Sequence, residues 1–127
     1  MKMTETAEQF IVRKKKSDIG KIRKFKDITR TCFHVYKIVA ITYMIESHFS
    51  EKVFELQRLE YLKTIDNDGV EINKASMPTI TFRIGYYIIG KIGRANGRWW
   101  WGQSAPLLFG NDLMLLIQKA KEDGTIL

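Results

Sequence analysis

The chain has 127 residues, of which 45% are hydrophobic, and its 21 basic and 14 acidic side chains give a formal net charge of +7. This length and composition predict one domain, and the one cysteine excludes an intrachain disulfide and favours the cytoplasm. The longest apolar stretch, residues 33–45, contains His34 and Lys37 and is too short for a membrane span of about 20 residues, so no membrane partner is expected.

The first 30 residues are strongly basic, with 10 Lys and Arg against 4 Asp and Glu. Apolar residues recur every third position in residues 17–28, which predicts a basic helix or arm over residues 1–26, ahead of a single α+β domain over residues 27–127. Such cations bind phosphates without reading base sequence, although a solvated arm would have the same composition. The candidate phosphate contacts here are Arg13, Lys14, Lys15, Lys16, Lys21, Arg23 and Lys24.

Residues 27–65 are rich in β-branched and aromatic side chains, and their apolar residues follow neither the period of a helix nor that of a strand. This composition favours two strands. Residues 66–69 read Asp-Asn-Asp-Gly, which predicts a turn, and a loop is expected from there to Pro78.

The chain contains few residues that could bind a metal or perform catalysis. Cys32, His34 and His48 could supply three ligands, but their spacing fits no zinc motif. His34 could form an acid–base pair with Glu46 or Glu51, but nothing in the sequence places them together. We therefore expect no cofactor, no metal site and no enzymatic activity.

Two glycine-containing motifs resemble phosphate-binding elements. Residues 85–91 have the GxxxxGK spacing of a phosphate-binding loop, but Ile92 stands where a magnesium-binding hydroxyl is needed and the interior reads as strand. Residues 88–93 look like the IIGxxG turn of KH domains, which joins two helices and clamps the backbone of single-stranded nucleic acid. The strand before it and the tryptophans after it favour a bulge or bend in a long strand instead.

Residues 79–92 alternate at strand period, with an apolar even-numbered face. Asn96-Gly97 predicts a type I′ hairpin turn, and the three tryptophans begin the returning strand, which should end near Pro106. An even-numbered loop places Trp99 and Trp101 on the apolar face and in the core. An odd loop would bury Trp100 instead.

Residues 79–108 contain four basic and no acidic side chains. With an even loop, Trp100 points away from the core with Lys91, and the other candidate cations beside it are Arg83, Arg94 and Arg98. An exposed indole among cations can stack on an unpaired base. The alternatives are that a helix covers this face and Trp100 is core, or that a protein partner binds there.

In the C-terminal region, apolar residues recur at helical spacing, which predicts an amphipathic helix. Asn111 is a candidate N-cap, and Gly124 can end the helix. The residues expected on its apolar, core-facing stripe are Leu113, Leu116, Ile117 and Ala120.

Together these patterns predict an α+β fold with an antiparallel sheet, the hairpin of residues 79–104 at its centre, packed against the C-terminal helix. The expected function is non-enzymatic binding of nucleic acid, single-stranded or non-specific, mainly through phosphates and aromatic stacking. The alternative is a protein-interaction or homo-oligomerisation module that presents the same basic, Trp-containing face to an acidic protein surface.

Overall fold

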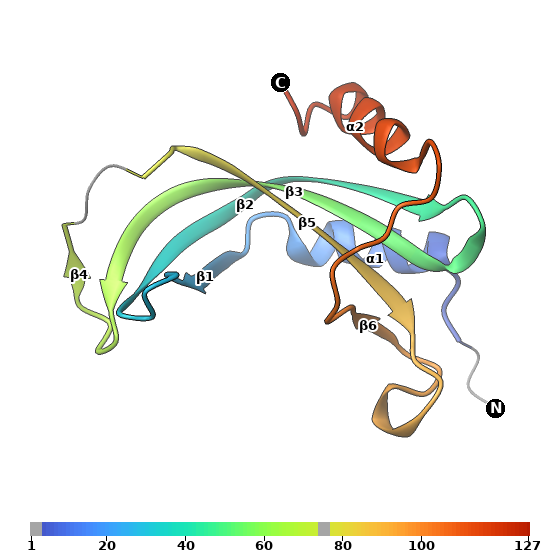
Figure 1. The fold of residues 1–127 in the computed structure, drawn as a ribbon, viewed down its shortest axis with the longest axis horizontal. Coiled ribbons are helices and arrows are strands. Elements are labelled where there is room, and N and C mark those ends of the chain that lie inside the picture. Colours follow the sequence, from blue (N-terminus) through green and yellow to red (C-terminus); the bar gives the residue numbers. More distant parts are fainter. Residues whose placement is uncertain (1–3, 74–76) are drawn as a thin grey trace.

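The computed structural model describes residues 4–73 and 77–127 and contains a curved antiparallel sheet with a helix on each face (Figure 1). The strands are β1 (Ile22–Lys26), β2 (Cys32–Glu46), β3 (Phe49–Asp66), β4 (Glu71–Ile72), β5 (Ile80–Ile89) and β6 (Trp99–Trp101). The helices are α1 (Ala7–Asp18), α2 (Asp112–Glu122) and the short 3₁₀ helix η1 (Gly93–Ala95). The predicted α+β class is confirmed.

The strands lie in the order β1-β2-β3-β5-β6, and β4 pairs with β3 beside this path. The β5–β6 hairpin, expected at the centre of the sheet, therefore lies at one side. The centre is built by β2 and β3, of 15 and 18 residues, which confirm the two strands predicted for this region. Their ladder contains three register shifts, and such β-bulges bend the strands that carry them.

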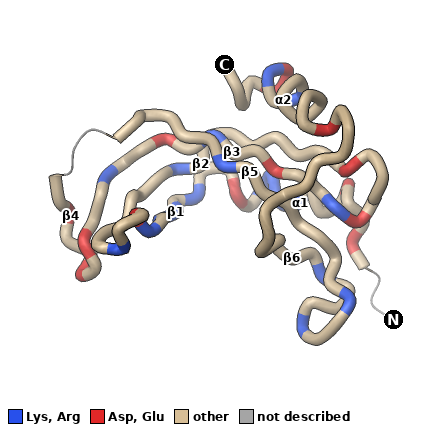
Figure 2. The backbone as a smooth tube through the Cα atoms, in the orientation of Figure 1, with Lys and Arg blue, Asp and Glu red and all other residues tan. Residues whose placement is uncertain are grey.

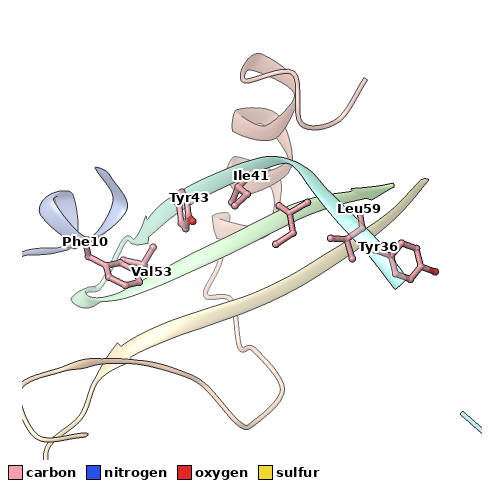
Figure 3. Close-up of a cluster of buried hydrophobic side chains, with 8 residues drawn as sticks. Phe10, Tyr36, Ile41, Tyr43, Val53 and Leu59 are labelled. Carbon is pink, nitrogen blue, oxygen red and sulfur yellow. The ribbon is translucent and has the colours of Figure 1, made fainter. Parts of the chain in front are cut away.

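Neighbouring residues of a strand point to opposite faces, so the sheet has two separate cores. On the concave face, Tyr43 and Val53 pack with Phe10 of α1 (Figure 3). On the convex face, Phe54 packs with Leu116 of α2. In the described part of the chain, no helix is both long enough and apolar enough to cross a lipid bilayer.

The helix predicted within residues 17–28 is wrong, because α1 ends at Asp18 and the segment that follows forms β1. α1 begins with a capping box, in which Thr6 Oγ1 accepts from Gln9 N–H and Gln9 Oε1 accepts from Thr6 N–H. Gly20 has a φ of +95° and turns the chain out of the helix and into β1. Apolar residues three apart did not distinguish a helix from a strand that follows a turn.

The predicted C-terminal helix is confirmed as α2, and Gly124, with a φ of +79°, follows its end. Leu116 and Ala120 are fully buried and Ile117 is half-buried. Leu113 was expected in the core, but it remains 45% exposed. The helix rests on the sheet along a narrower stripe than the apolar periodicity suggests, so Leu113 lies at its margin.

Asn111 occupies the predicted N-cap position of α2, but it does not cap the helix with its side chain. Asn111 has a helical backbone conformation and its side chain makes no capping hydrogen bond. The next residue, Asp112, is buried, and its carboxylate accepts hydrogen bonds from both the N–H and the hydroxyl of Ser47. The start of α2 is thus tied to the β2–β3 turn by a contact that no local pattern predicts.

The loop between β5 and β6 spans residues 90–98, an odd number, and Trp99, Trp100 and Trp101 pair with residues 89, 88 and 87. The predicted even loop is wrong. The type I′ turn is also wrong, because Asn96 has a φ of −57° and only Gly97 has a positive φ. Trp99 and Trp101 nevertheless face the concave core, and Trp100 is 43% exposed, because the core-facing residues of β5 here are odd-numbered.

The turn predicted at residues 66–69 is confirmed. Asp66 Oδ1 accepts hydrogen bonds from the N–H groups of Asp68 and Val70, and Gly69 has a φ of +84°. β4 then occupies part of the stretch expected to be loop. The remainder of that stretch includes residues 74–76, which lie outside the described residues.

Candidate functional site

Three of the cations predicted to bind phosphate are held in ion pairs. Arg13 Nε lies 2.9 Å from a Glu5 carboxylate oxygen. Lys14 and Lys21 both contact the buried Asp18, with Nζ–O distances of 2.8 Å and 3.1 Å. Burial alone would raise the pKa of Asp18, but hydrogen bonds from three neighbouring side chains outweigh it and lower the pKa to about 2. Asp18 therefore keeps its negative charge and neutralises part of this cluster.

Outside β1, four other predicted cations are exposed and form no ion pair with any described residue. Lys15 and Lys16 lie on α1, and Arg94 and Arg98 lie in the β5–β6 loop. Lys91, at the start of this loop, instead binds Glu51 with an Nζ–O distance of 2.6 Å. The four exposed cations remain available to a negatively charged partner.

The two predicted contacts on β1 point in opposite directions, as alternation in a strand requires. Arg23 lies opposite Tyr36, on the concave face. Lys24 lies on the other face, with its Nζ 4.9 Å from the centroid of the Phe33 ring. The sequence could not make this distinction while the segment was expected to be helical.

Trp100 lies apart from the cations of the concave side. It pairs with Ile88, and its side chain is on the convex face. The expectation that Trp100 shares a face with Lys91 depended on an even loop and is wrong. The structure thus brings Trp99 and Trp101, rather than Trp100, to the side of the sheet that carries α1 and Arg23.

A pocket of about 270 Å³ opens on the concave face beside the end of the sheet that α1 leaves uncovered. Its wall is mostly apolar and aromatic, with one cationic side chain at its rim. Phe25 and Tyr36 stand with ring centroids 6.0 Å apart. The residues that line the pocket are Phe25, His34, Tyr36, Leu59, Thr81, Phe82 and Arg83.

Arg83 is the most unusual group of this pocket. Its guanidinium carbon lies 5.0 Å from the centroid of Phe25 and 4.4 Å from that of Trp101, so the cation is held between two aromatic rings. It forms no hydrogen bond or ion pair with any described residue. Gly85 makes this arrangement possible, because a Cβ at that position would collide with the Trp101 ring. Burial lowers the pKa of Arg83, against the raising influence of the nearby Glu55.

Glu55 and its neighbours form a buried polar cluster behind Arg83. The Glu55 side chain is fully buried and accepts a hydrogen bond from Gln57 Nε2. Burial raises the pKa of Glu55, and the hydrogen bond from Gln57 opposes this shift. Glu55 Oε2, Gln57 Oε1 and Tyr43 Oη have no hydrogen-bond partner among the described groups. Buried polar atoms of this kind usually have a partner such as water or a ligand.

His34 is not paired with Glu46 or Glu51. Its Nε2 lies 2.6 Å from Asp27 Oδ1, and its Nδ1 lies 2.9 Å from the Thr64 hydroxyl. His48 lies in the β2–β3 turn, where it bonds to Ser47, so the trio of Cys32, His34 and His48 is not brought together. No local pattern identifies Asp27 as the partner of His34, because only the β1–β2 pairing places it there.

Comparison of the chain with protein-family models, with curated proteins and with solved structures found no match. Its function has to be inferred from its own geometry. The pocket was missed at the level of sequence, where Arg83 was a candidate only as a cation beside Trp100, although Arg83 is the one charged residue of β5, whose sequence is ITFRIGYYII. A lone cation within an apolar strand is the signal that could have identified it.

Proposed function

We propose that the protein binds single-stranded nucleic acid along its concave side, with one base in the aromatic pocket and a neighbouring phosphate at Arg83. The observation that carries this proposal is the guanidinium of Arg83, held between Phe25 and Trp101 with no acceptor among the described residues. A guanidinium matches the geometry of a phosphate group with two parallel hydrogen bonds. Aromatic walls beside it suit the flat face of a base.

The distribution of the other cations supports a backbone path around this pocket. Figure 2 shows Lys and Arg positions along β1 and in the β5–β6 loop, and α1, which carries further cations, lies under the concave face. Arg23 lies beside the pocket on β1, and the exposed pairs on α1 and in the loop extend the basic surface. Cations of this kind contact phosphates rather than base edges, so we expect little sequence preference.

Binding can be measured by the fluorescence anisotropy of labelled single-stranded DNA and RNA of about 12 nucleotides, at low salt and again at about 200 mM salt. Arg83→Gln should weaken binding by about 10-fold to 100-fold, the loss expected for a stacked base and its phosphate contact. Arg83→Lys should retain most of the salt dependence but not the affinity, because an ammonium lacks the planar fork.

Lys119→Gln is the matched control, since it removes one positive charge from the exposed surface of α2, on the opposite face of the sheet. Its affinity should stay close to that of the parent protein. The proposal fails if the parent does not bind at low salt, or if Arg83→Gln binds as tightly as Lys119→Gln.

A second function, self-association, is favoured by an exposed apolar strip on the convex face. Large contiguous apolar patches on a protein surface often mark a site of protein–protein interaction. The strip follows the solvent-facing side of β5 and continues onto β6. Its residues are Ile80, Phe82, Ile84, Ile88 and Trp100.

The outer edge of β5 also lacks a partner over residues 80–85 in the described part of the chain. Tyr86 O accepts from Gly102 N–H, so the backbone groups of the even-numbered residues point to this edge. The other edge strand, β1, is protected by three cations in IRKFK. A second copy could pair antiparallel with β5, centred on Phe82. This register sets Ile80 against Ile84 and Thr81 against Arg83, and keeps the two arginines apart.

Sedimentation equilibrium at two salt concentrations tests this second function. Self-association should strengthen as salt screens the repulsion between two chains of charge +7, whereas nucleic-acid binding weakens with salt. Ile84→Glu should give a monomer, while Val12→Glu, on the outer surface of α1, should not change the oligomeric state. A parent protein that is monomeric at high salt and high concentration would exclude this function.

A further inference from the structure

Three side chains of different chemistry meet where β1 turns into β2. Asp27 follows β1 and lies opposite Cys32, because the Asp27 N–H donates to the Cys32 carbonyl oxygen at 2.9 Å. His34 is two residues beyond Cys32 in β2, so both side chains lie on the same face. The carboxylate oxygen, the sulfur and the imidazole nitrogen all lie within 4.8 Å of one another. We propose that Asp27, Cys32 and His34 bind one Zn²⁺ ion.

The donor atoms suit zinc better than the other common biological cations. Zn²⁺ accepts thiolate, imidazole and carboxylate ligands together, whereas Mg²⁺ and Ca²⁺ prefer oxygen alone. In a tetrahedral site with bonds of about 2.0–2.3 Å, the ligand atoms stand about 3.3–3.8 Å apart. Asp27 Oδ1 and His34 Nε2 are 2.6 Å apart, so the two groups need to separate by about 1 Å to admit the ion. Water would complete the fourth position.

The imidazole of His34 is already oriented for this role. Its Nδ1 lies 2.9 Å from the Thr64 hydroxyl, and that hydroxyl lies 2.6 Å from the Tyr61 hydroxyl. This chain of polar groups fixes the ring and directs Nε2 toward Asp27. Metal-binding histidines are usually held in this way through the nitrogen that does not bind the metal.

The carboxylate is held by its own turn. Asp27 Oδ2 accepts hydrogen bonds from the N–H and the hydroxyl of Thr29, and Oδ1 faces His34. The Thr29 hydroxyl is in turn 2.8 Å from that of Thr31. The turn therefore leaves one carboxylate oxygen on the side of the other two ligands.

The surroundings allow an ion to enter and then to be retained. Cys32 is buried, which would shield a bound ion from competing solvent ligands. The ring of His34 is part of the wall of the concave pocket, which provides a path from solvent. Binding would convert the thiol to a thiolate, and its proton would pass to the buffer as the Zn–S bond forms. The ion would fasten β1 to β2. This inference does not depend on nucleic-acid binding.

The test is a titration with Co²⁺, a coloured substitute for Zn²⁺, of the full chain after chelation and under reducing conditions. One equivalent of Co²⁺ should produce a sulfur-to-cobalt charge-transfer band in the near ultraviolet, and one equivalent of Zn²⁺ should abolish it. The chain contains a single cysteine, so such a band must come from Cys32. Native mass spectrometry should show one zinc ion per chain.

The two histidines of the chain provide a matched pair of variants. His34→Gln removes a ligand and should weaken Co²⁺ binding by more than about 100-fold. Thr64→Val removes only the hydrogen bond that orients His34, and it should weaken binding by about 10-fold to 100-fold. His48→Gln should bind as the parent does, because His48 lies in the β2–β3 turn. Circular dichroism of each variant without metal controls for folding.

Several results would overturn the proposal. One is the absence of a charge-transfer band at millimolar Co²⁺, with the parent protein folded. Another is a band that saturates at half an equivalent, since this would mean that cysteines of two chains share the ion. A third is equal affinity in His34→Gln and His48→Gln.

Discussion

Phe10→Ala is expected to lower the free energy of unfolding by about 3–5 kcal/mol, the range for deletion of a fully buried aromatic side chain. Phe10 is 1% exposed. Its ring stacks on Trp99 with a centroid distance of 4.7 Å and meets Tyr87 edge-on at 4.8 Å. The substitution therefore removes the contact that joins α1 to both strands of the tryptophan hairpin. Urea denaturation followed by tryptophan fluorescence measures the effect.

Val12→Ala is the control for this prediction, because Val12 lies on the same helix but is 56% exposed. It should change the free energy of unfolding by no more than about 0.5 kcal/mol. Equal denaturation midpoints for Phe10→Ala and Val12→Ala would mean that α1 does not dock on the sheet in solution.

Leu116→Ala is expected to destabilise the protein by about 2–5 kcal/mol. Leu116 is fully buried between α2 and the convex face, in a cluster with Phe54, Leu56 and Ala120. A helix of 11 residues gains little stability in isolation, so α2 depends on this contact. Loss of helical circular dichroism before the main denaturation transition would show that α2 detaches first.

Leu113→Ala removes the same side chain one turn earlier on α2, where it is largely exposed. It should lower the free energy of unfolding much less than Leu116→Ala, because substitutions at exposed positions change this free energy by only about 0.5 kcal/mol. A loss as large as that of Leu116→Ala would contradict the orientation of α2 described above, and would mean that Leu113 is covered in solution.

Much of the local structure could be predicted from the sequence because its causes are local. The 3.6-residue period of Leu116 and Ala120 predicts α2, and the Asp-Asn-Asp-Gly sequence at residues 66–69 predicts a turn through its own side chain and glycine. The density of β-branched and aromatic residues predicts β2 and β3. At the N-terminus, Thr6 and Gln9 have the spacing of a capping box and mark the start of α1, whereas the apolar spacing of residues 17–28 does not correspond to a helix.

The candidate site could be predicted only in part. The basic character of α1, β1 and the β5–β6 loop follows from composition, and this supports the proposed class of ligand. Composition does not show which of these cations are held in ion pairs. Asp18 and Glu51 neutralise Lys14, Lys21 and Lys91 through contacts that depend on how α1 and the hairpins fold. Arg83 becomes distinctive only because Phe25 and Trp101 arrive from other strands.

The sequence by itself determined where helix α2 and the long strands lie, since residue spacing, glycine and turn-forming side chains act within a few positions of one another. The tertiary structure decided which face of β5 is core. β5 carries apolar or aromatic side chains on both faces, so alternation alone could not choose between them. The choice came from Phe10 of α1, which packs on Tyr87 and Trp99, and from the odd length of the loop before β6. Both are contacts between segments distant in sequence, and burial of apolar area between such segments is what selects one face over the other.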